Sequence, residues 1–249
     1  DIIIEEIVKS KPESKYIFGI SYYGISKANE GFNIKNKLKA LNINSRLIQS
    51  KEKALSSPEI KNNKILEKGA DFVVIKNKET YTIGKTIAAQ DYESYSYRDY
   101  DRPRRNAKSG MLPPKIAQIM INLIPERVAT IYDPFCGQGT ILQEALLMGY
   151  KVMGSDISES RIYDTRQNLA WLTDSYEIKK VADDLIFKSN ALEISGETLP
   201  INANAIVSEV YLGPPLTRYA RKNELKDIVD EMEKKYIRFL KNTISRAKS

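Results

Sequence analysis

Short apolar runs alternate with amphipathic stretches through the C-terminal half of the chain. The apolar runs predict buried strands near residues 128–133, 151–156, 185–188 and 205–209, and the amphipathic stretches predict helices near 115–124, 140–148 and 158–171. Strands that alternate with helices imply a parallel, doubly wound α/β sheet that binds its ligand at the carboxyl ends of the strands. One long amphipathic helix, from residue 224 to about 247, follows the last strand.

The N-terminal part, residues 15–89, has the predicted order β-α-β-α-β-β. Strands are expected at 16–22 and 46–48, and Ile34, Leu38 and Leu41 fall on one face of the helix between them. Ser57 is the expected N-cap of the second helix, with Pro58 at its first position and Gly69 as its C-cap. Residues 72–75 and 81–84 predict a hairpin. A second, α+β domain is therefore expected at residues 1–89, joined by a linker at 90–112 to a domain at 113–249.

Composition narrows the function classes. The chain of 249 residues is 42% hydrophobic and 29% charged, as in an ordinary soluble globular protein. It has one cysteine and no histidine, which excludes an intramolecular disulfide and the usual zinc sites. No apolar run approaches the ~20 residues of a membrane span, so a cytoplasmic, metal-independent protein is expected. The net charge of +7 suits a polyanionic partner.

The segment Asp133-Pro-Phe-Cys-Gly-Gln-Gly-Thr140 carries the most chemical information. It lies between a predicted strand and a predicted helix, and its two glycines let the backbone pass close to a ligand at the helix N-terminus. A dinucleotide site would have glycine in place of Leu142, and a phosphate loop would have a lysine after Gly139. The carboxylate of Asp133 suits an ammonium or sulfonium group and repels a pyrophosphate. S-adenosylmethionine therefore fits this loop best.

A second acid, Asp156, ends the next predicted strand. Its distance from the glycine loop is near the spacing at which an acid binds ribose hydroxyls. The alternative is a surface carboxylate that caps the helix starting near Ser158.

These residues resemble motif I of class I S-adenosylmethionine-dependent methyltransferases, in the form found in THUMP-linked RNA methylases. The resemblance extends to Gly110–Lys115, similar to the segment that leads into the helix before motif I, and to Ser208–Pro215, placed like the family's D/N-P-P-Y loop. The group it resembles is the tRNA guanosine N2-methyltransferases with an N-terminal THUMP domain. The resemblance implies a Rossmann-like catalytic domain, a THUMP-like RNA-binding domain at residues 1–89, and cofactor contacts by Pro113, Asp133, Phe135, Cys136, Gly137, Gly139, Thr140, Asp156, Ile157, Asn190 and Ala191. Asn190 is placed where the family usually has an acid that contacts adenine, and a helix cap or turn is the alternative role.

The fourth-strand loop departs from the family pattern, and two registers are open. Either Glu209 replaces the family's acid, or Ser208 does so and Tyr211 matches its tyrosine. Chemistry favours Glu209, because an amine that attacks a methyl sulfonium needs an acceptor for its N–H and a counter-charge. Tyr211 would then stack on the flipped base. A strand-end glutamate before a proline-rich turn, with no catalytic role, is the alternative.

Arginines interleave with tyrosines in residues 92–105. Arginine binds phosphates in a bidentate manner and tyrosine stacks on bases, so RNA contacts are expected from Arg98, Arg102, Arg104 and Arg105. An interdomain linker with internal ion pairs explains the same pattern.

The leading function is methylation of an exocyclic base amine in RNA, namely guanosine N2 in tRNA. One alternative is an adenine N6-methyltransferase on DNA or RNA. Another is a non-catalytic RNA-binding protein with a degenerate methyltransferase fold, because the catalytic loop is altered and no fifth strand or terminal hairpin is evident after the long helix. Either truncation or a reduced copy of the fold would explain that absence.

Overall fold

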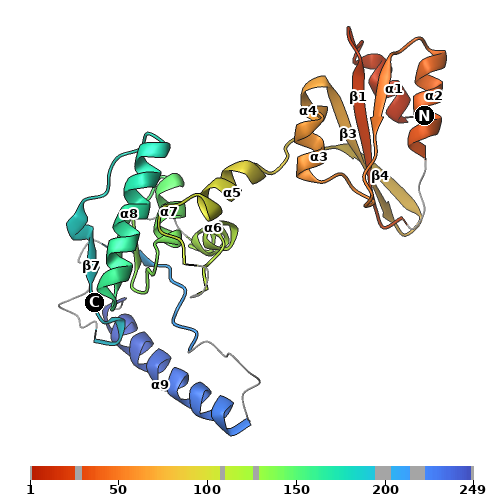
Figure 1. Ribbon diagram of the computed structural model, residues 1–249. Helices are drawn as coiled ribbons and strands as arrows, with labels where there is room; N and C mark the ends of the chain where they lie inside the picture. The colour runs from red at the N-terminus through yellow and green to blue at the C-terminus, as the bar shows by residue number, and fades with distance from the viewer. Residues whose placement is uncertain are drawn as a thin grey trace. The chain divides into compact units, whose positions relative to one another are not determined.

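The computed structural model describes residues 2–25, 30–106, 110–125, 129–193, 203–213 and 222–247. The chain divides into two compact units, Asp1–Glu93 and Ser94–Ser249 (Figure 1). The division falls inside the segment 90–112 that the sequence assigns to a linker.

The first unit contains a four-stranded sheet with the strand order β2-β1-β3-β4. β1 pairs in parallel with β2 and β3, and β3 and β4 form an antiparallel hairpin. Its elements are α1 (Ile2–Lys9), β1 (Tyr16–Tyr23), α2 (Glu30–Ala40), β2 (Ser45–Ile48), α3 (Ser57–Asn62), α4 (Ile65–Lys68), β3 (Gly69–Asn77) and β4 (Thr80–Lys85). The predicted order of strands and helices is confirmed, with the second helix split into α3 and α4.

Alternate side chains of β1 pack on opposite faces of this sheet. Phe18 is buried with Ile7 of α1 and Leu38 of α2. The next residue back, Ile17, is buried on the other face with Ile60 of α3 and Ile65 of α4. The α1–α2 pair and the α3–α4 pair therefore cover the two faces.

Two details at the ends of α3 and α4 differ from the sequence prediction. The N-cap is Ser56 and not Ser57: its hydroxyl accepts the N–H of Glu59, and the Glu59 side chain accepts the N–H of Ser56 in a capping box. Gly69 does end α4, but its backbone is extended and not left-handed. A Cβ at this position would lie 1.8 Å from the carbonyl oxygen of Ile17, so close pairing with β1 is what requires glycine.

The second unit contains the predicted parallel sheet, in the strand order β7-β6-β5-β8. Its elements are α5 (Tyr92–Tyr100), α6 (Pro114–Asn122), β5 (Thr130–Asp133), α7 (Thr140–Leu147), β6 (Lys151–Asp156), α8 (Glu159–Ser175), the 3-10 turn η2 (Asp183–Leu185), β7 (Ile186–Lys188), the 3-10 turn η3 (Ala191–Glu193), β8 (Ala205–Ile206) and α9 (Lys222–Ala247). Part of the first predicted strand, Val128, lies outside the described residues. The predicted fold class, α/β with a parallel sheet, is confirmed for this unit.

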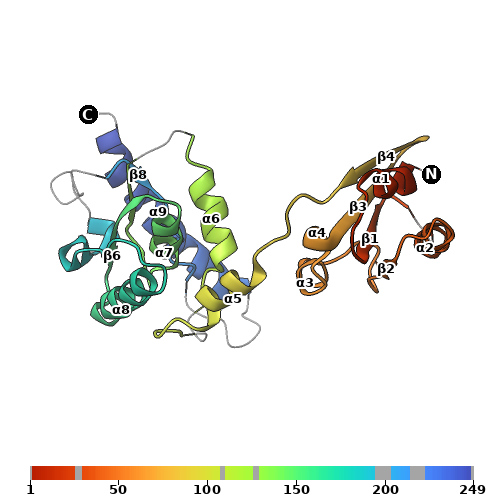
Figure 2. The ribbon, with the colours of Figure 1, turned by 90° about the horizontal axis from the view of Figure 1, so that it is seen from above.

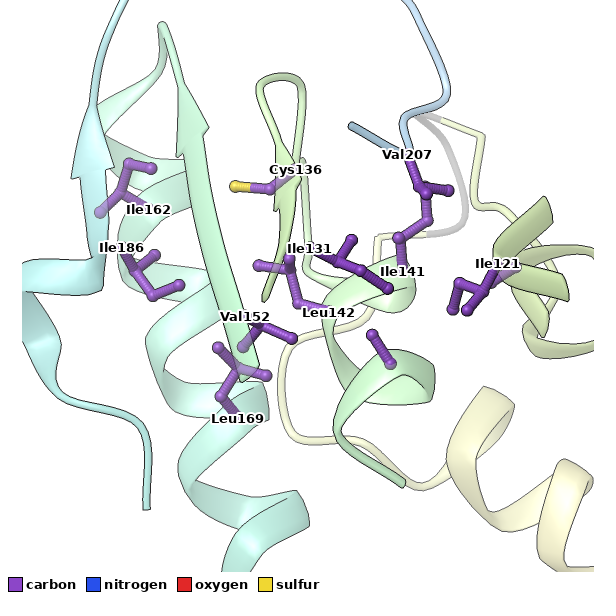
Figure 3. Packing of buried hydrophobic residues seen from close by; sticks show 12 residues of the cluster. Ile121, Ile131, Cys136, Ile141, Leu142, Val152, Ile162, Leu169, Ile186 and Val207 are labelled. Atoms are coloured by element: carbon purple, nitrogen blue, oxygen red, sulfur yellow. The ribbon is translucent and has the colours of Figure 1, made fainter. Parts of the chain in front are cut away.

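The two faces of this sheet have different covers. Ile131, Val152 and Ile186 pack with residues of α6, α7 and α8 in one buried cluster (Figure 3). On the other face, Tyr132 packs with Phe239 of α9. In Figure 1, α7 and α8 accordingly lie together, and the blue helix α9 runs below them. In the view of Figure 2, α9 passes behind α7. α9 thus covers the face of the sheet that α6–α8 leave open.

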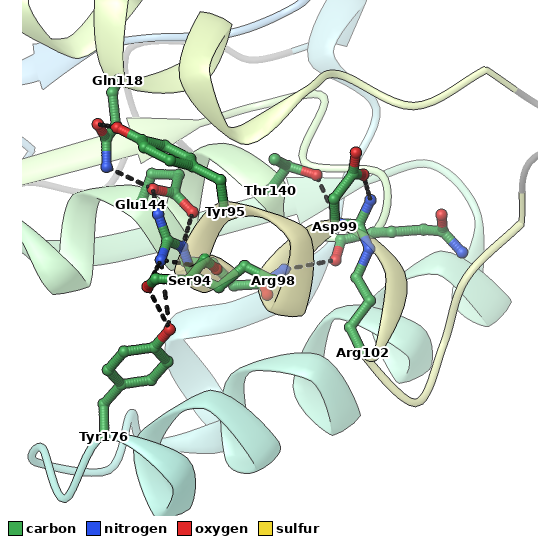
Figure 4. A network of polar contacts seen from close by, with 11 residues as sticks. Ser94, Tyr95, Arg98, Asp99, Arg102, Gln118, Thr140, Glu144 and Tyr176 are labelled. Carbon is green, nitrogen blue, oxygen red and sulfur yellow. Dashed lines mark hydrogen bonds and ion pairs between the residues drawn. The ribbon is translucent and has the colours of Figure 1, made fainter. Parts of the chain in front are cut away.

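The segment predicted as a linker is partly built into the second unit. Arg98 of α5 forms an ion pair with Glu144 of α7, with Nε 2.6 Å from Oε1, and both side chains are almost completely buried (Figure 4). Tyr97 packs on Trp171 of α8 with ring centroids 4.9 Å apart. The prediction of a linker over all of 90–112 is therefore wrong for α5, because its side chains pack against two helices of the second unit.

Candidate cofactor site

The loop between β5 and α7 takes the shape that its sequence predicts. Gly137 and Gly139 both have positive φ angles, of 54° and 82°. A Cβ on Gly139 would also lie 2.9 Å from Thr165 of α8, so this position requires glycine for two reasons. The N–H of Cys136 donates to the carbonyl of Ser155 on β6 at 2.9 Å, which fixes the loop against the neighbouring strand.

A cavity of about 600 Å³ opens at the carboxyl ends of the strands, within the usual range for small-molecule sites of roughly 300–1,000 Å³. It brings together most of the predicted cofactor and catalytic residues: Asp133, Phe135, Cys136, Gly137, Thr140, Asp156, Ile157, Asn190, Ala191, Glu209 and Tyr211. Pro113 and Gly139 do not line it. Pro113 is the N-cap of α6, next to the lining residue Leu112, and Gly139 shapes the loop from behind.

Asp133 is the most electrostatically perturbed group in the cavity. Burial raises the pKa of its carboxyl to about 7, against hydrogen bonds from the Ser208 hydroxyl and the Phe135 N–H that favour the charged form. The charges of Asp156 and Glu209 add to the increase in this pKa. Three carboxyl groups therefore face one small space, which favours a ligand that brings positive charge.

Asp156 connects the glycine loop to the start of α8. Its Oδ2 accepts the N–H of Gly137 at 3.1 Å, and its Oδ1 accepts the N–H of Ser158 at 2.9 Å. The capping role is therefore present. Because each carboxylate oxygen has more than one lone pair and the residue lines the cavity, Asp156 can accept ribose hydroxyls as well.

Asn190 also has a local role. Its Oδ1 accepts the N–H of Leu192 at 3.1 Å, so it caps the turn η3 as the alternative interpretation expects. Its side-chain amide has separate donors, and Asn190 lines the cavity with Ala191 and the exposed side chain of Ile157.

The loop after β8 faces the cavity through Glu209 and Tyr211. Ser208 does not line the cavity, and its hydroxyl donates to Oδ1 of Asp133 at 2.5 Å. Helix α9 supports the loop, because the Tyr236 hydroxyl donates to the carbonyl of Tyr211 and Lys235 lies over the Tyr211 ring. Pro214 and Pro215, the end of the predicted turn, lie outside the described residues.

Several residues that line the cavity are not predicted from the sequence. They include Arg161, in the first turn of α8, and Lys235 and Tyr236 in the middle of α9. Arg161 lies shortly after Asp156, and that proximity is a usable signal in the sequence. Lys235 and Tyr236 carry no such signal, because their presence at the site depends on how α9 docks across the sheet.

The four arginines expected to contact RNA differ in accessibility. Arg98 is bound to Glu144, and the side chain of Arg102 is completely inaccessible, with its Nη1 donating to the Thr140 hydroxyl at 2.7 Å. The expectation of phosphate contacts is therefore wrong for these two, since neither reaches the surface. Arg104 and Arg105 are exposed and lie over the rings of Tyr163 and Tyr100.

Burial lowers the pKa of the Arg102 guanidinium, with only the charge of Asp99 and a weaker effect of Glu144 in opposition. Burial is also the largest effect on Arg98 and acts in the same direction, but the hydrogen bonds and charges of Glu144 and Tyr176 together outweigh it, so the pKa of Arg98 is raised. The cost of burying the guanidinium charge is thus offset by neighbouring groups for Arg98 but not for Arg102.

Within the described part of the chain, no group of acidic residues and cysteine is arranged to hold a metal ion, and no helix is long and apolar enough to cross a membrane.

The site fits S-adenosylmethionine on its donor set. The carboxyls of Asp133, Asp156 and Glu209 suit the sulfonium, the ammonium and the ribose hydroxyls, and the exposed Ile157 offers an apolar surface to a base. When bound, this cofactor supplies an electrophilic methyl group on its sulfonium. The residues that line the cavity would hold and orient that group.

Comparison with known proteins agrees with this chemistry. A family model described as DNA methylase (N6_N4_Mtase) matches residues 2–167. Segments of the chain are similar to tRNA (guanine(10)-N2)-dimethyltransferases, with 44% identity over 79 residues in Methanothermobacter thermautotrophicus, 43% over 101 in Pyrococcus abyssi and 35% over 98 in Methanocaldococcus jannaschii. These matches cover 30%, 41% and 39% of this chain, and only 24%, 30% and 27% of those relatives.

Among solved structures, the putative methyltransferase SMU.472 complexed with SAH aligns over 94% of this chain and 69% of its own, with a TM-score of 0.39 and 13% identity. The family match spans more than half of the chain, including β5, the glycine loop and Asp156. The chain therefore belongs to the N6/N4 DNA methylase family, whose cofactor is S-adenosylmethionine.

Proposed function

We propose that the protein methylates an exocyclic amine of a base in RNA, specifically the N2 amine of guanosine in tRNA. The observation that carries this proposal is the position of Glu209, which lines the same cavity as the cofactor-type acids Asp133 and Asp156. The partial relatives support the finer choice of base and substrate, because three of them are tRNA (guanine(10)-N2)-dimethyltransferases.

The reaction needs an acceptor for the attacking amine. The lone pair of guanine N2, which is a weak base, would attack the methyl carbon while one N–H points to the Glu209 carboxylate. The methyl–sulfur bond would break as the N–C bond forms, so that the sulfonium leaves as the neutral thioether of S-adenosylhomocysteine and the positive charge passes to the amine. Glu209 would stabilise that charge and accept the proton that the amine then loses. Positioning of the two reactants supplies much of the remaining acceleration.

The surroundings of Glu209 support the register in which it replaces the family's acid. Its neighbour Ser208 is already bonded to Asp133 and does not line the cavity. Tyr211 lines the cavity with half of its surface exposed, and α9 holds its backbone in place. Tyr211 is therefore available to stack on a flipped base beside Glu209.

We also propose that residues 1–89 form a THUMP-like RNA-binding domain and that Arg104 and Arg105 contact the tRNA backbone. The β-α-β-α-β-β order of the first unit supports the former. The exposure of the two arginines beside tyrosine rings supports the latter.

A second candidate function is methylation of adenine N6 or cytosine N4 in DNA, which the name of the matching family model favours. Both reactions also transfer a methyl group to an exocyclic amine, so Glu209 would have the same role. What separates the two candidates is the nucleic acid and the base.

Labelled methyl transfer tests the proposal. The full chain is incubated with methyl-labelled S-adenosylmethionine and, separately, unmodified tRNA transcripts, total tRNA and double-stranded DNA, and the nucleosides are identified by mass spectrometry. Label in N2-methylguanosine or N2,N2-dimethylguanosine supports the proposal. Label in N6-methyladenosine or N4-methylcytosine from DNA would replace it with the second candidate, and cofactor binding without transfer would show a non-catalytic binding protein.

A further inference from the structure

Arg102 is buried against Thr140, the residue at which the glycine loop meets α7, and most of its hydrogen-bonding capacity is unused. Its Nη1 donates to Thr140, at the first position of α7. Within the described structure, its Nε and Nη2 are buried and have no hydrogen-bond partner. The carboxylate of Asp99 is its ion-pair partner, but at 3.9 Å from Nη2 it is too far for a hydrogen bond (Figure 4).

Arg98, four residues before Arg102, is a buried arginine whose three nitrogen atoms all have hydrogen-bond partners. Its Nε and Nη2 donate to both carboxylate oxygens of Glu144, and its Nη1 donates to Ser94 and Tyr176. Buried guanidinium groups are normally paired in this way, because a buried charge without partners is unfavourable. Arg102 lacks such pairing, although it contacts Thr140 at the cofactor cavity. A bound anionic group would therefore compensate its buried charge.

Thr140 connects Arg102 to the cavity. A guanidinium is only a donor, so the Thr140 hydroxyl must accept the bond from Nη1 and is left with its own proton to donate. Thr140 lines the cavity. Arg102 therefore fixes the orientation of a hydroxyl whose proton is available to a ligand acceptor.

The start of α7 adds further donors. Its N-cap is Gly139, which has no side chain to accept the free N–H groups of the first turn. The helix N-terminus also carries a partial positive charge. Two independent features, an uncapped helix start and an incompletely paired buried arginine, thus favour an anionic group at the same position.

We propose that Arg102 positions Thr140 and supplies the buried positive charge of a subsite for the α-carboxylate of the cofactor's methionine part. The neighbouring Asp133 then faces the ammonium of the same amino-acid end, so the two charges of the zwitterion have opposite partners on the two ends of one loop. Arg102 makes the site selective for a cofactor that carries a carboxylate. This inference depends on the assigned cofactor and not on which nucleic acid is methylated.

A matched pair of ligands tests the subsite without methyl transfer. S-adenosylmethionine and its decarboxylated analogue share the adenosine, sulfonium and ammonium, and differ only in the carboxylate. Binding of both to the full chain is measured by calorimetry, for wild type and for Arg102→Gln. Wild type is expected to prefer the carboxylate-bearing ligand, and Arg102→Gln to lose about tenfold or more in affinity for it, with affinity for the analogue unchanged or slightly higher.

Two other variants keep the test decisive. Thr140→Val keeps the shape of the side chain and removes the hydroxyl, so it should reduce the same preference even if Arg102→Gln does not fold. Arg98→Met is the control, because it removes the other buried arginine of residues 92–105. This variant should lower the stability of the protein but leave the ratio of the two affinities as in wild type.

Each outcome has one meaning. Equal weakening of both ligands by Arg102→Gln, with the ratio preserved, would show that Arg102 is only structural and would overturn the proposal. A wild-type ratio near one would overturn it as well. Failure of wild type to bind S-adenosylmethionine at all would instead refute the cofactor assignment, and the subsite with it.

Discussion

Asp133 is expected to stabilise cofactor binding at the expense of the free protein's stability. In the unliganded protein its pKa is raised from 3.8 to about 7, with burial as the main cause. An acid whose pKa is higher in the folded state contributes stability below its unfolded pKa, and loses that contribution as the pH rises through the folded value. Between about pH 4 and pH 7, ionisation of Asp133 therefore becomes increasingly costly to the fold.

The size of the effect follows from the shift. Each pKa unit corresponds to about 1.4 kcal/mol, so a shift of about three units gives up to about 4 kcal/mol at pH 8 relative to pH 4. Asp133→Asn removes the charge but keeps an oxygen that accepts the Ser208 hydroxyl and the Phe135 N–H, both of which now bond Oδ1. The variant should then be more stable than wild type at pH 8, and the difference should shrink at pH 5.

Urea unfolding followed by the fluorescence of Trp171 measures this difference. Trp171 is the single tryptophan, and its ring on α8 packs on Tyr97 of α5, so its signal reports the second unit. The free energy of unfolding is compared for wild type and Asp133→Asn at both pH values. A difference that does not change with pH, or a variant that is less stable than wild type at pH 8, would refute the argument.

The same variant should bind the cofactor poorly. A cationic ligand favours ionised Asp133, so wild-type affinity should fall by up to about tenfold for each pH unit below 7, with proton release on binding near pH 6.5. Asp133→Asn should show weaker binding without this pH dependence. The ligand's own ammonium titrates equally against both proteins, so only the difference between them reports Asp133.

Three further predictions concern binding and stability. Asp156→Ala should weaken cofactor binding by about 1–3 kcal/mol because a charge-assisted hydrogen bond is removed, and unchanged affinity in calorimetry would disprove the ribose assignment. Arg98→Met should cost about 3–5 kcal/mol of stability, because it leaves the buried Glu144 without its ion-pair partner. The double variant Arg98→Met with Glu144→Met should recover most of this loss. A cost of the single variant below about 1 kcal/mol, typical of exposed pairs, would contradict the buried ion pair. Replacing Arg104 and Arg105 by glutamine should flatten the log–log salt dependence of tRNA binding by roughly one unit for each arginine that binds a phosphate, whereas an unchanged slope would assign them to the protein's own surface.

The sheet of the second unit was predictable because its signals are local. A buried strand, a glycine loop and a helix start occur in consecutive residues from 130 to 147, and no distant partner is needed to recognise them. Asp156 ends the adjacent strand, so parallel topology alone places it beside the loop. These neighbouring residues are enough to indicate a nucleotide-type site.

Helix α5 was not predictable from the same signals. Its sequence, rich in tyrosine and charged residues, lacks an apolar stripe, so it resembles an exposed linker. What buries it is pairing with a partner 46 residues away, between Arg98 and Glu144. A buried ion pair has the same local sequence appearance as two surface charges, and only the tertiary structure separates them.

The contribution of α9 to the site could also not be predicted from the sequence. Its amphipathic pattern predicts a packed helix, but not which surface it covers. Phe239 meets Phe135 with ring centroids 5.2 Å apart, and this docking brings Lys235 and Tyr236 to the catalytic loop. Long-range packing of this kind determines which residues of a helix reach a site.

The catalytic role of Glu209 is tested most directly by the methyl-transfer rate of Glu209→Gln under single-turnover conditions, beside Ser208→Ala and with cofactor affinity measured for each variant. Glutamine keeps the size of the side chain and an acceptor but removes the charge. We expect a fall of ~100-fold or more in the rate of Glu209→Gln with cofactor affinity nearly unchanged, and a much smaller rate effect for Ser208→Ala. A near-normal rate for Glu209→Gln together with an inactive Ser208→Ala would contradict it and assign the catalytic loop to the other register.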